Sequence, residues 1–86
     1  MTRADLELEI RNCLGRLSER DVDTVPMDAE LGEAIGLDSL GRLELLSEVE
    51  DRLDITIYDV DSDKASTIGG MIDIVEHARL QGSEVV

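Results

Sequence analysis

Aromatic side chains are almost missing from the sequence, which contains one tyrosine and neither phenylalanine nor tryptophan. Hydrophobic residues nevertheless make up 42% of the 86 residues, so a core can form from leucine, isoleucine and valine. A chain of this length makes one domain and buries only about 60–65% of its unfolded surface. We therefore expect one small domain over residues 1–86, ordered over about 3–80, and no large catalytic scaffold.

Disulfides and membrane spans are also excluded. Cys13 is the one cysteine, so no internal disulfide can form, which fits the reducing cytoplasm. No apolar run approaches the ~20 residues of a membrane-spanning helix, and the first residues lack the apolar core of a signal peptide. The expectation is a cytoplasmic protein.

Positive charge is scarce, because 21 acidic residues stand against 8 basic ones and the net charge is −13 at pH 7. Nucleic acids and anionic membranes would repel such a chain, whereas basic protein surfaces would attract it. The charge would also keep a small domain monomeric. We expect protein partners, and neither nucleic acid nor membrane.

Apolar residues at helical spacing predict a helix near each end of the chain. The first helix would bury Leu6, Ile10, Cys13, Leu14 and Leu17. The last would start near Ser66 or Thr67, be weakened by Gly69 and Gly70 in its first turn, and bury Ile68, Met71, Ile72, Val75 and Ala78. Residues 81–86 are expected to fray.

The helical period fails from about Ser18 to Asp38, where Pro26 would stop a helix. This stretch is predicted to be a long loop with a short turn near Ala29–Glu33. It would be held to the core by Val22, Val25, Met27, Leu31 and Ile35.

A second long helix is predicted from Ser39 to about Leu53, capped by Asp38 or Ser39. Its core face would consist of Leu45, Leu46, Val49 and Leu53. A second face, apolar and acidic, adjoins the serine and consists of Leu40, Leu43, Glu44, Ser47, Glu48 and Asp51. Either its two leucines pack under the long loop, or this face docks on a partner protein.

An extended connector is expected at Ile55–Tyr58, with Ile55 or Ile57 turned inward, and a short helical turn at Asp59–Lys64. The whole pattern predicts an all-α bundle of three main helices, a short third helix and a long first loop.

The residues argue against two interpretations, a calcium-binding loop and a nucleophilic serine. Asp59–Asp63 begins like a calcium-binding loop, but Lys64 and Gly70 occupy the positions of the required glycine and glutamate, so no metal site is predicted. A nucleophilic Ser39 would need a base, and nothing orients His77, the one histidine, toward it. No catalytic residue is predicted.

Ser39 is better explained as a residue that another enzyme modifies. A phosphate attached at a helix N-terminus is favoured by the free backbone N–H groups and by the helix dipole. Asp38 directly before it could help a modifying enzyme to hold a metal ion. This combination suits a phosphodiester attached from outside.

The motif from Leu31 to Leu40, with Gly36-Leu37-Asp38-Ser39-Leu40 at its end and Leu43-Glu44-Leu45 after it, resembles that of acyl carrier proteins. The resemblance covers nearly the whole chain and implies the four-helix carrier bundle. It implies that a phosphopantetheinyl transferase with Mg²⁺ moves 4′-phosphopantetheine from coenzyme A onto Ser39. Acyl groups would then be held as thioesters, and the second helix would dock on basic partners through its mixed face.

Some residues depart from the pattern that is typical of fatty-acid carriers, and they bear on which cargo the chain carries. Gly41-Arg42 follows the motif where an acid and small residues are more usual, and Tyr58 stands where proline is common. They favour a specialised pathway, such as polyketide assembly, with an acyltransferase or acyl-adenylating ligase as loading enzyme and a ketosynthase as partner. The alternatives are a peptidyl carrier and an acidic helical interaction module without a prosthetic group.

Overall fold

The computed structural model describes residues 1–19, 21–58, 60 and 63–84, with side chains described up to residue 80. Three long helices are present, α1 (Arg3–Leu17), α3 (Ser39–Leu53) and α4 (Ile68–Glu84), with a short helix α2 (Leu31–Ile35) and a 3₁₀ turn η1 (Lys64–Ser66). The described residues contain no strand. The prediction of an all-α bundle is confirmed.

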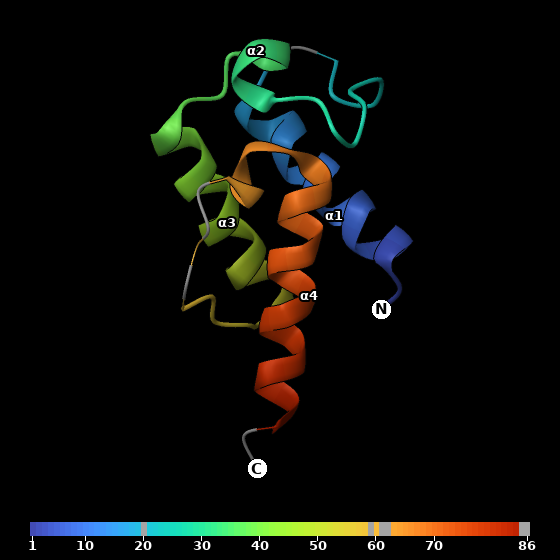
Figure 1. Ribbon diagram of the computed structural model, residues 1–86, viewed down its shortest axis with the longest axis vertical. Helices are drawn as coiled ribbons and strands as arrows, with labels where there is room; N and C mark the ends of the chain where they lie inside the picture. The colour runs from blue at the N-terminus through green and yellow to red at the C-terminus, as the bar shows by residue number, and fades with distance from the viewer. Residues whose placement is uncertain (20, 59, 61–62, 85–86) are drawn as a thin grey trace.

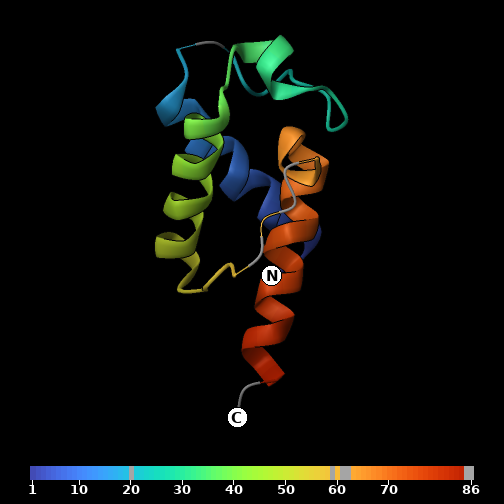
Figure 2. The ribbon, with the colours of Figure 1, turned by 60° about the vertical axis from the view of Figure 1, so that its left-hand side comes forward.

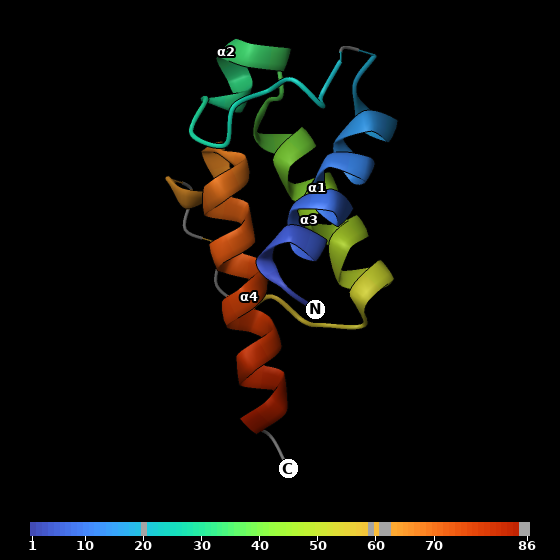
Figure 3. The same cartoon turned by 90° about the vertical axis from the view of Figure 1, so that its right-hand side faces the viewer.

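Helices α3 and α4 run in the same direction and both begin at the end of the bundle where α2 lies (Figure 1). Helix α1 crosses beside them and packs against both (Figure 2). The loop before α2 passes over that same end of the bundle (Figure 3). The first turn of α3 therefore lies where the long loop and α2 converge.

Helix α1 begins with a reciprocal cap between Thr2 and Asp5. Thr2 Oγ1 accepts from the backbone N–H of Asp5 at 3.2 Å, and Asp5 Oδ2 accepts from the N–H of Thr2 at 2.9 Å. These hydrogen bonds hold the pKa of Asp5 below its usual value. The helix buries Leu6, Ile10, Cys13 and Leu14 as predicted. The prediction for Leu17 is wrong: it is 38% exposed, because it ends the helix at the open end of the core.

The long loop contains a short helix, α2, that begins at Leu31, two residues after the start of the predicted turn. Glu30 caps α2, and its carboxylate accepts from the N–H groups of Gly32 at 3.1 Å and Glu33 at 2.8 Å. Four of the five side chains predicted to hold the loop are buried, and Met27 is half-buried. The buried four are Val22, Val25, Leu31 and Ile35.

Arg11 ties this loop to α1. Its Nη1 donates to the carbonyl oxygens of Val22 at 2.7 Å and Val25 at 2.9 Å, and its Nε donates to Glu7 at 2.8 Å. Only 13% of the Arg11 side chain is exposed. These carbonyls belong to no strand or helix, and that of Val22 also accepts from the N–H of Val25 at 3.4 Å, so the arginine adds charged donors to both.

Residues 55–58, which follow α3, form neither helix nor strand, in agreement with the predicted connector. Ile55 and Ile57 are both half-buried against the core. Glu50 fixes the connector because its carboxylate accepts from the N–H of Ile57 at 2.8 Å. The short third helix is a 3₁₀ turn that begins only at Lys64, and residues 59, 61 and 62 of its predicted range lie outside the described residues.

Helix α4 begins at Ile68, and Thr67 Oγ1 accepts from the N–H of Gly70 at 3.0 Å, so Thr67 is the cap. The two glycines allow close packing in addition to weakening the turn. A Cβ at Gly70 would lie 1.8 Å from the carbonyl oxygen of Lys64, and the N–H of Gly69 donates to the carbonyl of Met27 at 2.9 Å. The start of α4 thus touches both η1 and the long loop.

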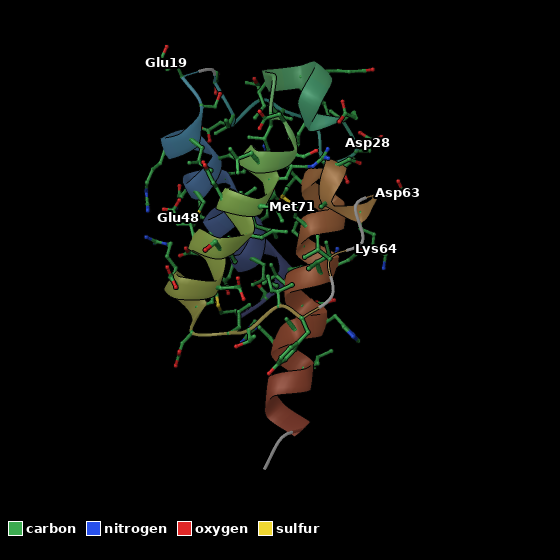
Figure 4. The ribbon with its side chains drawn as sticks, turned by 90° about the vertical axis from the view of Figure 1, so that its left-hand side faces the viewer. Glu19, Asp28, Glu48, Asp63, Lys64 and Met71 are labelled. Carbon is green, nitrogen blue, oxygen red and sulfur yellow. The ribbon has the colours of Figure 1, made fainter. Side chains whose placement is uncertain are left out.

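The core lies between the three long helices. From α3 it takes Leu45, Leu46 and Val49, while Leu53 is half-buried. Met71 points from α4 toward α3 and is fully buried (Figure 4). The predicted face of α4 is buried, and Ile74 joins it.

Helix α4 continues to Glu84, past Gln81, where fraying was expected to begin. No proline interrupts the sequence before Glu84, and Gly82 lies within the helix although glycine often follows a helix end. Within the described part of the chain, none of the helices combines the length and the apolar character that a membrane span needs.

Candidate functional site

A sharp turn at Gly36 leads from α2 into the motif. Gly36 has φ 72°, in the left-handed region that glycine adopts at least cost, and it ends α2. The N–H of Leu37 then donates back to the carbonyl of Leu31 at 3.3 Å. Leu37 is buried, so the turn is anchored in the core and the next residue faces outward.

Asp38, and not Ser39, caps helix α3. Its Oδ1 accepts from the N–H of Gly41 at 2.7 Å, while its carbonyl accepts from the N–H of Arg42 at 3.0 Å. Both Asp38 and Ser39 are exposed. With the cap assigned to the aspartate, the Ser39 hydroxyl at the first position of the helix is left accessible to another protein.

The Ser39 hydroxyl has a basic neighbour one turn along the helix. Arg42 Nη2 donates to Ser39 Oγ at 3.1 Å, and Arg42 Nη1 lies 4.0 Å from a carboxylate oxygen of Glu30. The Arg42 side chain is only 22% exposed. The arrangement links the serine to the residue that caps α2.

Hollows flank Ser39 on two sides. A hollow of about 290 Å³ opens between the end of α1 and the start of α3, lined by Leu17, Gly36, Leu37, Asp38, Leu40, Gly41 and Glu44. A smaller one of about 130 Å³ lies toward η1 and is lined by Ser39, Arg42, Leu43, Leu46, Val60 and Ala65. The side chains of Leu43, Leu46, Val60 and Ala65 make the second hollow largely apolar.

The second face of α3 is open to solvent. Leu40 is 63% and Leu43 56% exposed, so they do not pack under the long loop. Glu44, Ser47 and Asp51 are exposed beside them. Such apolar side chains within an acidic surface are typical of a surface that meets another protein.

Glu48, at the edge of this face, also belongs to the helix–helix packing. Its carboxylate pairs with Arg16 of α1, and a quarter of its side chain is exposed. Figure 4 shows it on the side of α3 away from α4. Part of its charge is therefore already neutralised within the protein.

The other reactive residues lie apart from this arrangement. Cys13 is fully buried in α1, and its burial, together with the negative charge of Glu48, raises the pKa of its thiol. His77 is exposed on α4. Sequence reasoning missed Arg42 as a neighbour of the serine, although the spacing of three residues along a helix is the signal that could have found it.

Comparisons with known proteins identify the family of the chain. Residues 9–75 match the family model described as "Phosphopantetheine attachment site". The chain is 28% identical to an acyl carrier protein of an Exiguobacterium species and 28% identical to one of Chlorobium phaeobacteroides. The two alignments cover 88% and 87% of the chain and 96% of each relative.

A third relative is much larger. The chain is 32% identical, over 93% of its length, to a segment that makes up 3% of a polyunsaturated fatty acid synthase of a Thraustochytrium species. The family match spans most of the chain. The chain therefore belongs to the phosphopantetheine attachment family, among the acyl carrier proteins, which bear covalent 4′-phosphopantetheine and catalyse no reaction themselves.

Proposed function

We propose that Ser39 carries the 4′-phosphopantetheine arm and that the arm holds acyl intermediates of a fatty-acid or polyketide pathway as thioesters. The observation that carries this proposal is the exposed Ser39 at the first position of α3. The turn at Gly36 leads into this position, and because Asp38 caps the helix, the serine hydroxyl is not used as the cap. It lies within the region that matches the family.

The residues present fit the group in access, because Ser39 is exposed, and Arg42 places one cation beside its Oγ. In the attachment step, Ser39 Oγ loses its proton and forms a bond to the phosphorus of the pantetheine phosphate. The diphosphate bond of coenzyme A breaks, and adenosine 3′,5′-bisphosphate leaves. Once attached, the arm supplies a terminal thiol for acyl groups. The chain itself contributes the exposed hydroxyl and its rigid placement on a capped helix.

The second face of α3 supports a docking role next to that serine. In our proposal Leu40 and Leu43 insert into apolar sites of partner enzymes, and Glu44, Ser47, Glu48 and Asp51 face basic residues around them. The partners would be a phosphopantetheinyl transferase, an acyl-loading enzyme and a ketosynthase. Encounters steered by charge are fast and easily reversed, which suits a carrier that visits several enzymes.

Fewer observations support the proposed cargo. The small hollow beside Ser39 is lined by Leu43, Leu46 and Ala65, and these apolar side chains suit an apolar group carried on an arm that folds back against the protein. The similarity to one segment of a polyunsaturated fatty acid synthase supports acyl chemistry. Gly41-Arg42 still favours a specialised pathway over bulk fatty-acid synthesis.

Intact-mass spectrometry tests the attachment. After incubation with coenzyme A, Mg²⁺ and a broad-specificity transferase, the wild-type chain gains the mass of one phosphopantetheine and Ser39→Ala gains none. Thr56→Ala is the control, because Thr56 is an exposed hydroxyl residue outside the second face of α3, and its loss leaves the addition intact. An unmodified wild type, or a modified Ser39→Ala chain, refutes the proposal in favour of a helical interaction module.

The mass of material isolated from its native host tests the cargo. A fatty acyl or polyketide intermediate on the arm supports the proposal. An aminoacyl group in its place would make the chain a peptidyl carrier.

A further inference from the structure

The guanidinium group of Arg42 lies next to the hydroxyl to which the arm is proposed to attach. It donates to Ser39 Oγ at 3.1 Å and lies 4.0 Å from Glu30, the cap of α2. With 22% of the side chain exposed, Arg42 is packed more closely than a free surface arginine. The residue is thus held near the serine by groups from two different helices.

Negative charge surrounds this position. Asp38 directly precedes the serine and Glu30 lies behind Arg42, in a protein of net charge −13. A phosphodiester at Ser39 would add one more negative charge beside the Asp38 carboxylate. Like charges at such short range repel each other, so a cation within reach of the phosphate would favour the modified state.

We propose that Arg42 is a positioning residue for the prosthetic arm and binds its phosphate. A guanidinium presents several N–H donors in one plane, and two of them match two oxygens of a phosphate. Phosphorus bonded to Oγ brings its two free oxygens next to the group that now donates to that Oγ. The inference rests on the attachment proposed at Ser39. It adds that Arg42 holds the phosphate at the base of the arm.

The contact also gives the arm a direction. Arg42 and Ser39 both line the smaller hollow, whereas neither lines the larger one on the other side of the helix. A phosphate held by Arg42 would direct the arm toward the smaller hollow and toward η1. The thiol end of the arm, with any acyl group on it, would then extend past the side of the hollow that Leu43 and Val60 line.

The test compares four chains: wild type, Arg42→Gln, Arg42→Lys and the control Arg52→Gln. Arg52 lies on the same helix, where it pairs with Glu9 of α1, so the control removes the same charge away from the serine. Each chain is converted with coenzyme A, Mg²⁺ and a transferase, and conversion is confirmed by mass. The phosphorus NMR shift and the change in unfolding temperature on modification are then measured.

We expect wild type and Arg52→Gln to show the same phosphorus NMR chemical shift and the same change in unfolding temperature on modification. In Arg42→Gln the phosphorus resonance moves, and the change in unfolding temperature on modification is lower by roughly 2–4 °C, as loss of a partly exposed ion pair predicts. Arg42→Lys falls between the two, because it keeps the charge but loses the planar fork. High salt reduces the difference.

Failures of the two proposals are distinguishable. If all four chains are modified and Arg42→Gln matches Arg52→Gln in both measurements, Arg42 does not bind the phosphate, while attachment at Ser39 stands. If the wild-type chain gains no mass under conditions that modify a known carrier, attachment itself is refuted, and the role of Arg42 is refuted with it.

Discussion

At the scale of single residues, arginines organise the parts of this protein that are not helical. Arg11 joins α1 to the long loop through the carbonyls of Val22 and Val25. Arg42 joins the first turn of α3 to the serine and to Glu30. Both use the several donors of one guanidinium to contact groups that belong to different segments. In a chain with so few basic residues, their placement has a large effect on the structure.

Arg11→Gln should therefore destabilise the fold by about 1–3 kcal/mol, because two carbonyls of the loop lose a charged donor in a mostly buried place. Urea denaturation followed by circular dichroism measures the loss. Arg16→Gln is the control: Arg16 is half exposed and its ion pair with Glu48 is partly in solvent, so its loss costs about 0–1 kcal/mol. Equal costs for the two variants would show that the loop is not anchored by Arg11.

At the scale of elements, the junction between η1 and α4 depends on the absence of a side chain. Gly70 lies against the backbone of Lys64, and a backbone contact cannot be relieved by turning a side chain. Gly15 in α1 is different, because the nearest atom to a methyl group added there is a side-chain carbon of Val22 at 3.7 Å, an ordinary contact distance. The same residue type thus serves close packing in one helix and only weakens the other.

Replacing each glycine by alanine should have opposite effects. Gly70→Ala is expected to lower the free energy of unfolding by at least about 2 kcal/mol through the clash with Lys64. Gly15→Ala is expected to raise it by about 0.5–1 kcal/mol, since alanine favours the helix. Thermal unfolding of both variants beside the wild type measures the two effects. A neutral Gly70→Ala would mean that η1 moves away from α4 at little cost.

At the scale of the whole molecule, the dominant property is a net charge of −13. The charge acts over about 8 Å at physiological ionic strength and over only ~3 Å at 1 M salt. Partner association should be sensitive to salt for this reason. The open face of α3, with Leu40 and Leu43 among acidic residues, is where we expect that charge to be used.

The rate of association with a basic transferase, measured by stopped flow, should fall at least about tenfold between low and high salt. Glu44→Lys should slow association more than Asp28→Lys, which makes the same charge change in the long loop. Both carboxylates are exposed, so folding is little affected by either substitution. Equal slowing by the two variants would indicate that only the net charge matters and not the face of α3.

Much of the fold and of the candidate site could be predicted from the residues alone. The spacing of Leu6, Ile10 and Leu14, and of Leu45 and Val49, identifies which side chains share a helical face. Asp38 beside Ser39 predicts a capped helix start, and the motif around them indicates the family that the comparisons show. These features are local in the chain, so the sequence determines them by itself.

Contacts between distant segments were decided only by the tertiary structure. Spacing shows that Leu40 and Leu43 share a face but does not show what covers it, and the structure leaves that face open. The same limit explains the exposure of Leu17 and the carbonyls bound by Arg11. A periodic pattern records positions around one helix, whereas burial depends on which other segment packs there, and that is settled when the chain folds.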